Sequence, residues 1–422
     1  MGMNKSISFI IIFVLVFPFL AQAEEISLSL DEAIALALRE NRDILLKRED
    51  VKKAKEKIKE ANAGLLPTLS FTGTWSDYRS YYDKDLAQST TQTSLKQYLY
   101  KGGKTVNTIR YNKNKLEVYQ ALLDKTKIET ILSVKDGFYT LLLAQGFANI
   151  NQGIVENSKE HLNFIKQRYE NGQASESDIL NIEASLETVQ KAYDESLNQI
   201  EAAQVILNNL LYLDNDTRIK PDGDFSYAPA EVAYDEAFLQ AMRQRPEIKQ
   251  YEAQAKADKN TIEMAKADSR PSIYASWDYY SRSHASLAGS RGWNDYNIIG
   301  LTFSWPIFDG WATKAKVEQA IIDLKETRLS KEKTIKDIAL ELKNTYLDLK
   351  NAIAKIKSTQ AEADLYKDTL SVTEEKYKTG IASSLDLNDA SLGYEVALFN
   401  QRQATYDYIL AKARFEKATG GL

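Results

Sequence analysis

Cysteine is absent from this sequence of 422 residues, and histidine is nearly so, with only His161 and His284. The absence of cysteine excludes disulfides, thiolate metal sites and lipidation at an N-terminal cysteine. Methionine, another soft metal ligand, occurs only four times. The sequence shows no nucleophile paired with a base, no metal-ligating cluster and no phosphate-binding loop. We therefore predict no catalytic, cofactor-binding or metal-binding residues, and we expect that the protein is not an enzyme.

Long apolar runs are also missing beyond the N-terminal segment. A transmembrane helix would need about eighteen consecutive apolar residues. In that segment, Lys5 precedes an apolar run over 7–20, which ends at the small residues Ala21 and Ala23. This pattern is typical of a secretory signal peptide, which we expect over residues 1–23. A membrane anchor is the alternative, although the run is short for one. The formal net charge is −5, and no basic patch favours binding to nucleic acid.

Proline is scarce, and it is absent both from 68–220 and after Pro306. The run 311–378 also lacks glycine, and its apolar residues recur in steps of three and four, which is typical of a coiled-coil helix. Such a helix is about 100 Å long, which suits a rod or the wall of a tube. We predict a matching helix over 103–170, although three glycines weaken the pattern there.

Repeated markers in the same order indicate that the chain is an internal duplication. Asp31-Glu32-Ala33 recurs 204 residues later at Asp235, and the Gly102 marker recurs 208 residues later at Gly310. After the signal peptide we place a first repeat over 24–213, a polar linker over 214–232 and a second repeat over 233–422. Each repeat is predicted to contain a helix, two strands, a long helix, an elbow and another helix. The strand pairs are 67–101 and 271–310, the long helices 103–170 and 311–378, and the elbows 171–175 and 379–383.

The most specific repeated motif is Tyr-x-x-Gly-x-x-Ser-x-x-Asp at each elbow. Glycine can take the left-handed conformation that ends a helix, and the serine and aspartate suit a capping box at the start of the next helix. Each copy therefore predicts a turn between two antiparallel helices. Beyond the second motif stands Asp389, which shares a helix face with the motif aspartate, and its first-repeat position holds Asn181. The motif residues are Tyr169, Gly172, Ser175 and Asp178 in the first copy, and Tyr377, Gly380, Ser383 and Asp386 in the second.

The predicted strands alternate apolar and polar residues, which is typical of membrane strands with one face toward lipid and one toward a polar lumen. Aromatic residues favour membrane–water interfaces, and four tryptophans at or near these strands fit that role: Trp75, Trp277, Trp305 and Trp311. An ordinary soluble hairpin is the alternative. Four strands cannot close a barrel, and open strand edges cannot lie in lipid. Membrane insertion therefore requires several chains to pool their strands, although composition does not fix their number.

Over essentially the whole mature chain, the duplicated elbows, the strand pairs and the two long helices resemble the TolC-type outer membrane efflux protein family. The resemblance implies a mainly α fold with membrane β-strands, in which long antiparallel coiled-coil helices form a periplasmic α-barrel. It implies a homotrimer in which each protomer gives four strands to a shared twelve-stranded β-barrel. It also implies an exit duct for a tripartite efflux or type I secretion system in the outer membrane of a Gram-negative bacterium. Without a lipid-accepting cysteine, the sequence resembles the non-lipidated members.

The resemblance also implies partners: outer membrane lipid, a periplasmic adaptor, and an inner-membrane transporter reached through that adaptor. The adaptor is expected to dock at the elbows, through the motif tyrosines, glycines and serines. Under threefold symmetry, Asp178, Asp386 and Asp389 would form the periplasmic gate, whereas a capping role alone is the alternative for the first two. Some members carry an arginine where this chain has Ala382, so the closing contacts are expected to differ. A periplasmic coiled-coil structural or adaptor protein without channel activity is the alternative function, and the alternating strands and clustered aromatics favour the channel.

Overall fold

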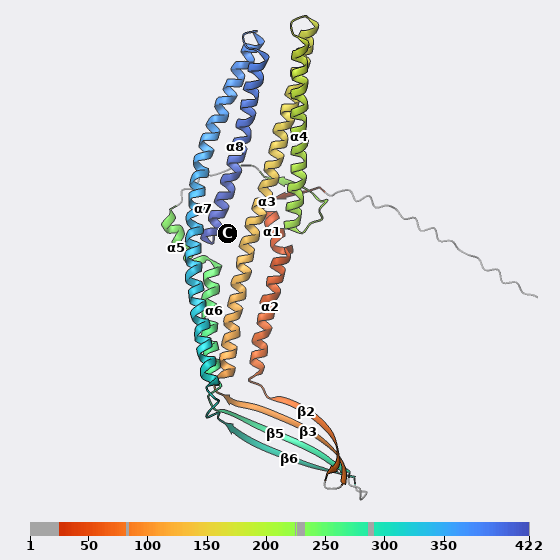
Figure 1. Cartoon of the computed structure of the whole chain (residues 1–422), viewed down its shortest axis with the longest axis vertical. Helices are drawn as coiled ribbons and strands as arrows, with labels where there is room; N and C mark the ends of the chain where they lie inside the picture. The colour runs from red at the N-terminus through yellow and green to blue at the C-terminus, as the bar shows by residue number, and fades with distance from the viewer. Residues whose placement is uncertain (1–24, 82–83, 224, 226–232, 286–290, 422) are drawn as a thin grey trace, which may run out of the picture.

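The computed structural model shows an elongated rod of helices with a four-stranded sheet at one end (Figure 1). The predicted signal peptide, 1–23, lies outside the described residues. Within the described part of the chain, no helix is both long enough and apolar enough to cross a membrane. The described residues are 25–81, 84–223, 225, 233–285 and 291–421.

Two helices of 67 residues each, α3 (Lys104–Glu170) and α7 (Ala312–Lys378), run the length of the rod. α4 (Glu176–Leu211) folds back along the half of α3 that is farther from the sheet, and α8 (Ser384–Thr419) does the same along α7. At 1.5 Å per residue, each long helix spans about 100 Å. The rod is therefore built from two helical hairpins that carry their elbows far from the sheet.

The helix predicted at the start of each repeat is divided in two. In the first repeat, α1 (Leu30–Glu40) and α2 (Arg42–Ala63) are separated by Asn41, whose side chain accepts hydrogen bonds from the amides that begin α2. In the second, α5 (Tyr234–Gln244) and α6 (Pro246–Ala267) are separated by Arg245, whose backbone is not helical (φ −56°, ψ 124°). Proline at the first position of α6 explains this break, because the residue before a proline avoids the helical conformation. α2 and α6 pack beside the sheet-proximal halves of α3 and α7.

The segment predicted as a polar linker contains a strand that the sequence analysis missed. β4 (Arg218–Asp222) pairs in parallel with β1 (Glu25–Ser29), and its Ile219 side chain is buried. Five residues are too few for an alternating pattern to stand out in sequence. The pairing joins the start of the first repeat to the linker that follows it.

The large sheet is antiparallel and brings the two repeats together in the order β2-β3-β5-β6. The prediction extended the second strand pair to residue 310, but β6 stops before Pro306, which has no amide to donate to a ladder. In the described residues, the outer edges of β2 and β6 are unpaired. The strands are β2 (Thr68–Tyr81), β3 (Lys84–Lys101), β5 (Ser272–Ala285) and β6 (Arg291–Ser304).

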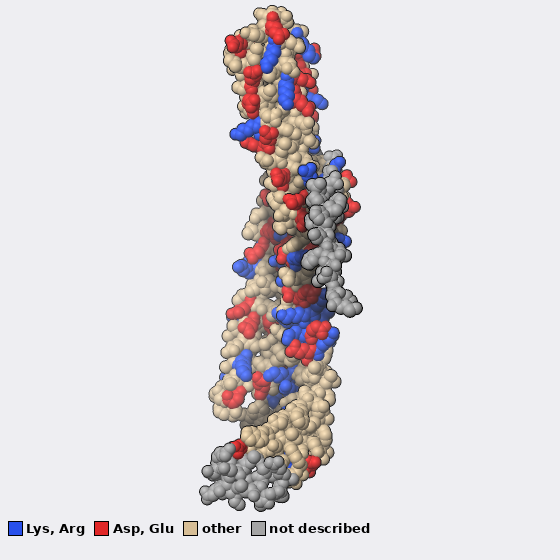
Figure 2. All heavy atoms as spheres, turned by 90° about the vertical axis from the view of Figure 1, so that its right-hand side faces the viewer, with Lys and Arg blue, Asp and Glu red and all other residues tan. Residues whose placement is uncertain are grey.

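The two faces of this sheet differ in chemistry. One face carries a row of directly opposed apolar side chains across all four strands: Leu69, Leu95, Trp277 and Ile299. These apolar side chains are exposed, as are Leu301 and Phe303 farther along β6. The opposite face is mostly polar, and Gln92 there donates to Asp278 over 3.1 Å. Figure 2 shows the strand end almost free of charged side chains on the face in view, whereas both signs are spread along the helices.

Two clusters of buried residues, one in each repeat, occupy corresponding positions in the middle of the rod. The first joins α1, α3 and α4, and the second joins α5, α7 and α8. The duplication therefore extends from the motifs to the packing of the core. The matched pairs are Ala33 and Ala237, Ala37 and Ala241, Val134 and Leu342, Leu141 and Leu349, Ala144 and Ala352, Ala203 and Ala411, and Leu207 and Phe415.

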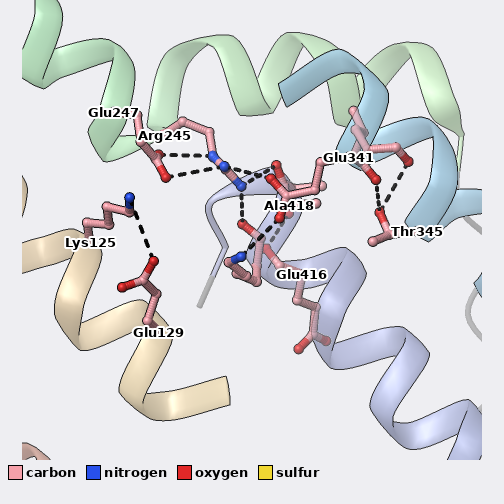
Figure 3. Close-up of polar contacts among 11 residues, drawn as sticks. Lys125, Glu129, Arg245, Glu247, Glu341, Thr345, Glu416 and Ala418 are labelled. Carbon is pink, nitrogen blue, oxygen red and sulfur yellow. Dashed lines mark hydrogen bonds and ion pairs between the residues drawn. The ribbon is translucent and has the colours of Figure 1, made fainter. Parts of the chain in front are cut away.

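A buried arginine ties the end of α8 to α6 and α7 (Figure 3). The Arg245 guanidinium donates to the Lys417 carbonyl over 3.2 Å, and it pairs with Glu341 at 2.8 Å and Glu247 at 3.1 Å. Lys417 also pairs with Glu341, at 3.0 Å. Partial burial opposes ionisation of Glu341, but the two cations hold the pKa of its carboxyl below the usual value. The network thus fixes the C-terminal end of the last helix against the second repeat.

Candidate functional site

The two elbows at the far end of the rod close with the same backbone geometry. Gly172 has φ +71° and Gly380 has φ +80°, so each long helix ends in a left-handed glycine. One residue beyond each glycine, the amide donates back to a helix carbonyl over 2.8 Å, from Gln173 to Arg168 and from Ile381 to Lys376. This arrangement satisfies carbonyls that a helix end otherwise leaves without partners.

A capping box starts the next helix at both elbows. In the first, the Ser175 amide donates to the Asp178 carboxylate over 2.8 Å, and the Asp178 amide donates to Ser175 Oγ over 3.2 Å. The second has the same bonds at 2.7 and 3.1 Å between Ser383 and Asp386. Hydrogen bonds from the two serines lower the pKa of both aspartates below the usual range. Both carboxylates are therefore charged at neutral pH and already engaged in capping.

Replacing Gly380 with alanine is expected to destabilise the second elbow through backbone strain alone. A Cβ added there would have no atom within 4 Å, so no steric clash contributes. The left-handed conformation costs an alanine about 1 kcal/mol relative to glycine. Asparagine tolerates this conformation better and serves as the control. Amide hydrogen exchange around residue 380 should rise in Gly380→Ala and much less in Gly380→Asn; equal exchange in the two variants would contradict strain as the cause.

A cleft of about 670 Å³ lies between the two hairpins just below the elbows. It is lined by residues of α3, α4, α7 and α8, and Tyr377 of α7 lies between its walls. The Tyr377 ring lies 5.7 Å from the ring of His161 and 5.8 Å from that of Phe164, both on α3. Burial lowers the pKa of His161, which favours the neutral imidazole at this contact. These rings join the two hairpins near their tips.

Tyr377 is only 8 % exposed, whereas Tyr169, at the corresponding position of the first motif, is 45 % exposed. Among the described residues, the Tyr377 hydroxyl has no hydrogen-bond partner. The repeated motif therefore places two tyrosines in different environments. One packs between the hairpins, and the other presents its ring to the surroundings of the protomer.

The three carboxylates predicted for the gate occupy different surfaces of the single protomer. Asp178 lines the cleft between the hairpins. Asp386 is exposed and bound to Ser383. Asp389 borders a separate groove of about 310 Å³ between α7 and α8, beside Glu362 and Tyr366. One protomer does not gather these carboxylates into a cluster, so any ring they form has to come from symmetry between protomers.

Two features of the tips escaped the sequence analysis. His161 and Phe164 were not singled out, because the corresponding second-repeat positions hold Thr369 and Val372 and no motif marks them. The close approach at Gly393 was also missed, where an added Cβ would lie 2.7 Å from the ring of Tyr366. Both depend on contacts between helices, which helical periodicity alone does not reveal.

The four tryptophans predicted for the membrane interface all have exposed indoles in the protomer. Trp75 and Trp277 lie on the sheet and on its apolar face. Trp305 follows β6, and its indole donates to the Ser269 carbonyl over 3.2 Å. Trp311 precedes α7 and has a left-handed backbone with φ +69°. They therefore lie at two levels, within the sheet and at its junction with the helices.

Comparison with known proteins finds that a family model described as outer membrane efflux protein matches residues 33–211 and 238–421. The alkaline protease secretion protein AprF of Pseudomonas aeruginosa is 23% identical, over 85% of this chain and 78% of its own. The toluene efflux pump outer membrane protein TtgC of Pseudomonas putida is 23% identical, over 93% and 83%. The outer membrane protein TolC of Escherichia coli is 22% identical, over 96% and 84%.

Solved structures show the same fold. The Campylobacter jejuni CmeC outer membrane channel superposes with a TM-score of 0.77 at 20% identity, over 93% of this chain and 85% of that one. The open state of the Neisseria gonorrhoeae MtrE outer membrane channel gives 0.73 at 19% identity, over 93% and 89%. The two matched segments of the family model correspond to the two repeats.

Proposed function

This chain belongs to the outer membrane efflux protein family, and on that premise we propose that it is the exit duct of a tripartite efflux or type I secretion system. The resemblance read from the elbows, strand pairs and long helices is thereby confirmed. The family consists of outer membrane channels and not of enzymes, which favours a duct over a periplasmic rod without channel activity. The relatives serve both secretion and efflux, as the names of AprF and TtgC state.

One observation carries the proposal: a sheet with one apolar and one polar face continues directly into helices of about 100 Å. The apolar face suits the hydrocarbon of an outer membrane, and the polar face suits a water-filled lumen. The helices then extend the duct into the periplasm. An exposed apolar row marks an interaction surface, and its pairing with a polar opposite face is what favours a membrane strand over a rod that only binds partners.

We propose that three protomers share one β-barrel and one helical tunnel. The open edges of β2 and β6 cannot lie in lipid with unpaired backbone groups, so each has to pair with a neighbouring chain. The number three comes from the family resemblance. The mass of the protein extracted from outer membranes in mild detergent tests it, with three copies expected. A monomer that remains stable in membranes would contradict the shared barrel.

A periplasmic adaptor is proposed to dock at the elbows and to link the duct to an inner-membrane transporter. The backbone turns at Gly172 and Gly380 present the same local shape twice in each protomer, and the first elbow adds the exposed ring of Tyr169. Ser175 and Ser383 hold this shape through their capping boxes. Site-specific crosslinking from position 169 to a co-expressed periplasmic adaptor tests the docking site, and crosslinks that form only far from the elbows would contradict it.

The gate proposal predicts different effects for the two second-repeat carboxylates. Asp386 is engaged with Ser383, whereas Asp389 is exposed and is free of any cap, so Asp389 is the better candidate for a threefold ring at the tunnel mouth. Rings of carboxylates attract cations and favour block by multivalent ions. Asp389→Asn is expected to weaken block by a trivalent cation in single-channel recordings. Asp386→Asn should mainly loosen the elbow; unchanged block in Asp389→Asn would remove this residue from the gate.

A further inference from the structure

The second repeat carries an exposed aromatic loop between its last strand, β6, and its long helix, α7. The corresponding loop of the first repeat is not aromatic. The aromatic loop, the junction loop (305–311), follows β6 and leads into α7. Its apolar side chains point away from the protein: Ile307 is 86 % exposed, Phe308 73 % and Trp311 68 %. In the first repeat, β3 stays paired with β5 as far as Lys101, with a register shift between Tyr98 and Tyr100, so less apolar surface projects there.

Trp311 occupies a backbone conformation that does not suit it. Its φ of +69° is left-handed, and the corresponding first-repeat residue, Gly103, has φ +85°. Glycine takes this conformation without penalty, whereas a bulky residue is strained in it. A glycine at position 311 would therefore serve the turn better. A strained residue of this kind points to a role for its side chain, and the Trp311 indole is 68 % exposed.

The surroundings of Trp311 combine apolar surface with one positive charge. The Phe308 ring packs edge-on against the indole, with centroids 5.9 Å apart. The Lys314 ammonium lies 5.5 Å from the indole centroid, and among the described residues no carboxylate forms an ion pair with it. Lys316, one half-turn on, is paired with Asp268 at 3.3 Å. Lys314 is thus a cation beside Trp311 that is left to meet an outside anion.

We propose that the junction loop inserts into the periplasmic leaflet of the outer membrane and that Lys314 binds the phosphate of an anionic phospholipid there. This inference rests on the proposed function, because the loop can reach the membrane only if the sheet is the membrane segment. The loop continues the exposed apolar run of β6 beyond Phe303, at the end of the sheet nearer the helices. Tryptophan is favoured at the level of the lipid headgroups, and lysine beside it complements their charge.

The test uses the full-length protein in vesicles of phosphatidylethanolamine with and without phosphatidylglycerol. The fluorescence of the wild type minus that of Trp311→Gly isolates the signal of Trp311. We expect quenching of this signal by lipids brominated near the headgroup and little quenching by aqueous iodide. Glycine suits the backbone at position 311, so the substitution keeps the turn. Efficient iodide quenching without bromolipid quenching would overturn the insertion.

The lysine is tested by counting the phosphatidylglycerol molecules that remain bound after extraction, using native mass spectrometry. Lys314→Gln is expected to bind this lipid about fivefold more weakly, the effect of one lysine at a membrane surface. Lys316→Gln, which removes the same charge from a lysine already paired, is the matched control. Equal losses in both variants, or none in Lys314→Gln, would overturn the site. Loss of the oligomer in Trp311→Gly would instead assign the loop to contact between protomers and would also overturn the proposal.

The conductance of the wild-type protein is measured separately from these variants. Failure to form a channel would contradict the proposed function even if Trp311 is quenched by lipid. Failure of lipid quenching in a conducting protein would contradict only the insertion of the junction loop into the membrane.

Discussion

Replacing Arg245 with alanine is expected to destabilise the protein by about 3–5 kcal/mol, the usual cost of removing one partner from a buried ion pair. The Arg245 side chain is only 6 % exposed and pairs with both Glu247 and Glu341. Without it, Glu247 loses its counter-charge, Glu341 keeps only Lys417, and the carbonyls at the end of α8 lose a donor. The midpoint of thermal or urea unfolding, followed by circular dichroism, measures the loss.

The matched control is Lys355→Ala, which removes an exposed ion pair with Asp407. Exposed pairs contribute about 1 kcal/mol or less, so this variant should unfold close to the wild type. Equal midpoints for Arg245→Ala and Lys355→Ala would show that the buried network does not stabilise the fold.

The same network predicts a dependence of stability on pH. The pKa of Glu341 is lowered in the folded protein, so its contribution is present above its unfolded pKa and is lost as the pH falls through the folded value. Unfolding midpoints of the wild type should therefore drop under acid conditions. In Arg245→Ala the pKa of Glu341 is expected to rise toward its unfolded value, so the acid-induced drop should be smaller. An acid profile identical to that of the wild type would contradict the pairing.

Replacing Tyr377 with alanine is expected to separate the two hairpins at their tips and to cost about 3 kcal/mol, at the lower end of the range for removal of a buried aromatic ring. The ring is buried against His161 and Phe164, and it is the contact that joins α7 to α3 beside the cleft. Under the proposed function, this separation opens the periplasmic end of the tunnel. Single-channel conductance should rise, and amide exchange in α3 near residue 161 should quicken.

Two further variants make this prediction specific. Tyr377→Phe removes a buried hydroxyl that has no partner among the described residues, so it should keep the hairpins closed. Tyr169→Ala removes the corresponding tyrosine of the first motif, whose exposed ring should matter little to stability. If Tyr169→Ala and Tyr377→Ala raise conductance equally, the ring contact is not what closes the tip.

The features predicted well from sequence are those set by neighbouring residues. Glycine, serine and aspartate within seven positions specify each elbow, and both capping boxes are present in the structure. The long helices were also predicted from local pattern, because apolar residues spaced by three and four over a long run without proline are typical of a helix. The duplication helped further, since each repeat supports the reading of the other.

The features that sequence missed depend on contacts between distant residues or on a single backbone angle. The contact of His161 with Tyr377 joins positions that are far apart in the sequence, and no motif near either residue predicts it. β4 is too short to show a period and exists because β1 lies beside it. The left-handed backbone of Trp311 is unusual for its residue type, so it could not be predicted from the sequence and is seen only in the structure.

The central claim is that this chain forms a channel through the outer membrane that continues along the helices. Conductance of the purified, full-length protein in planar lipid bilayers tests it most directly. We expect discrete, long-lived channels whose conductance rises in Tyr377→Ala and stays at the wild-type level in Tyr377→Phe. Stable membrane insertion of the correctly folded protein without any conductance, in the wild type and in Tyr377→Ala alike, would contradict it.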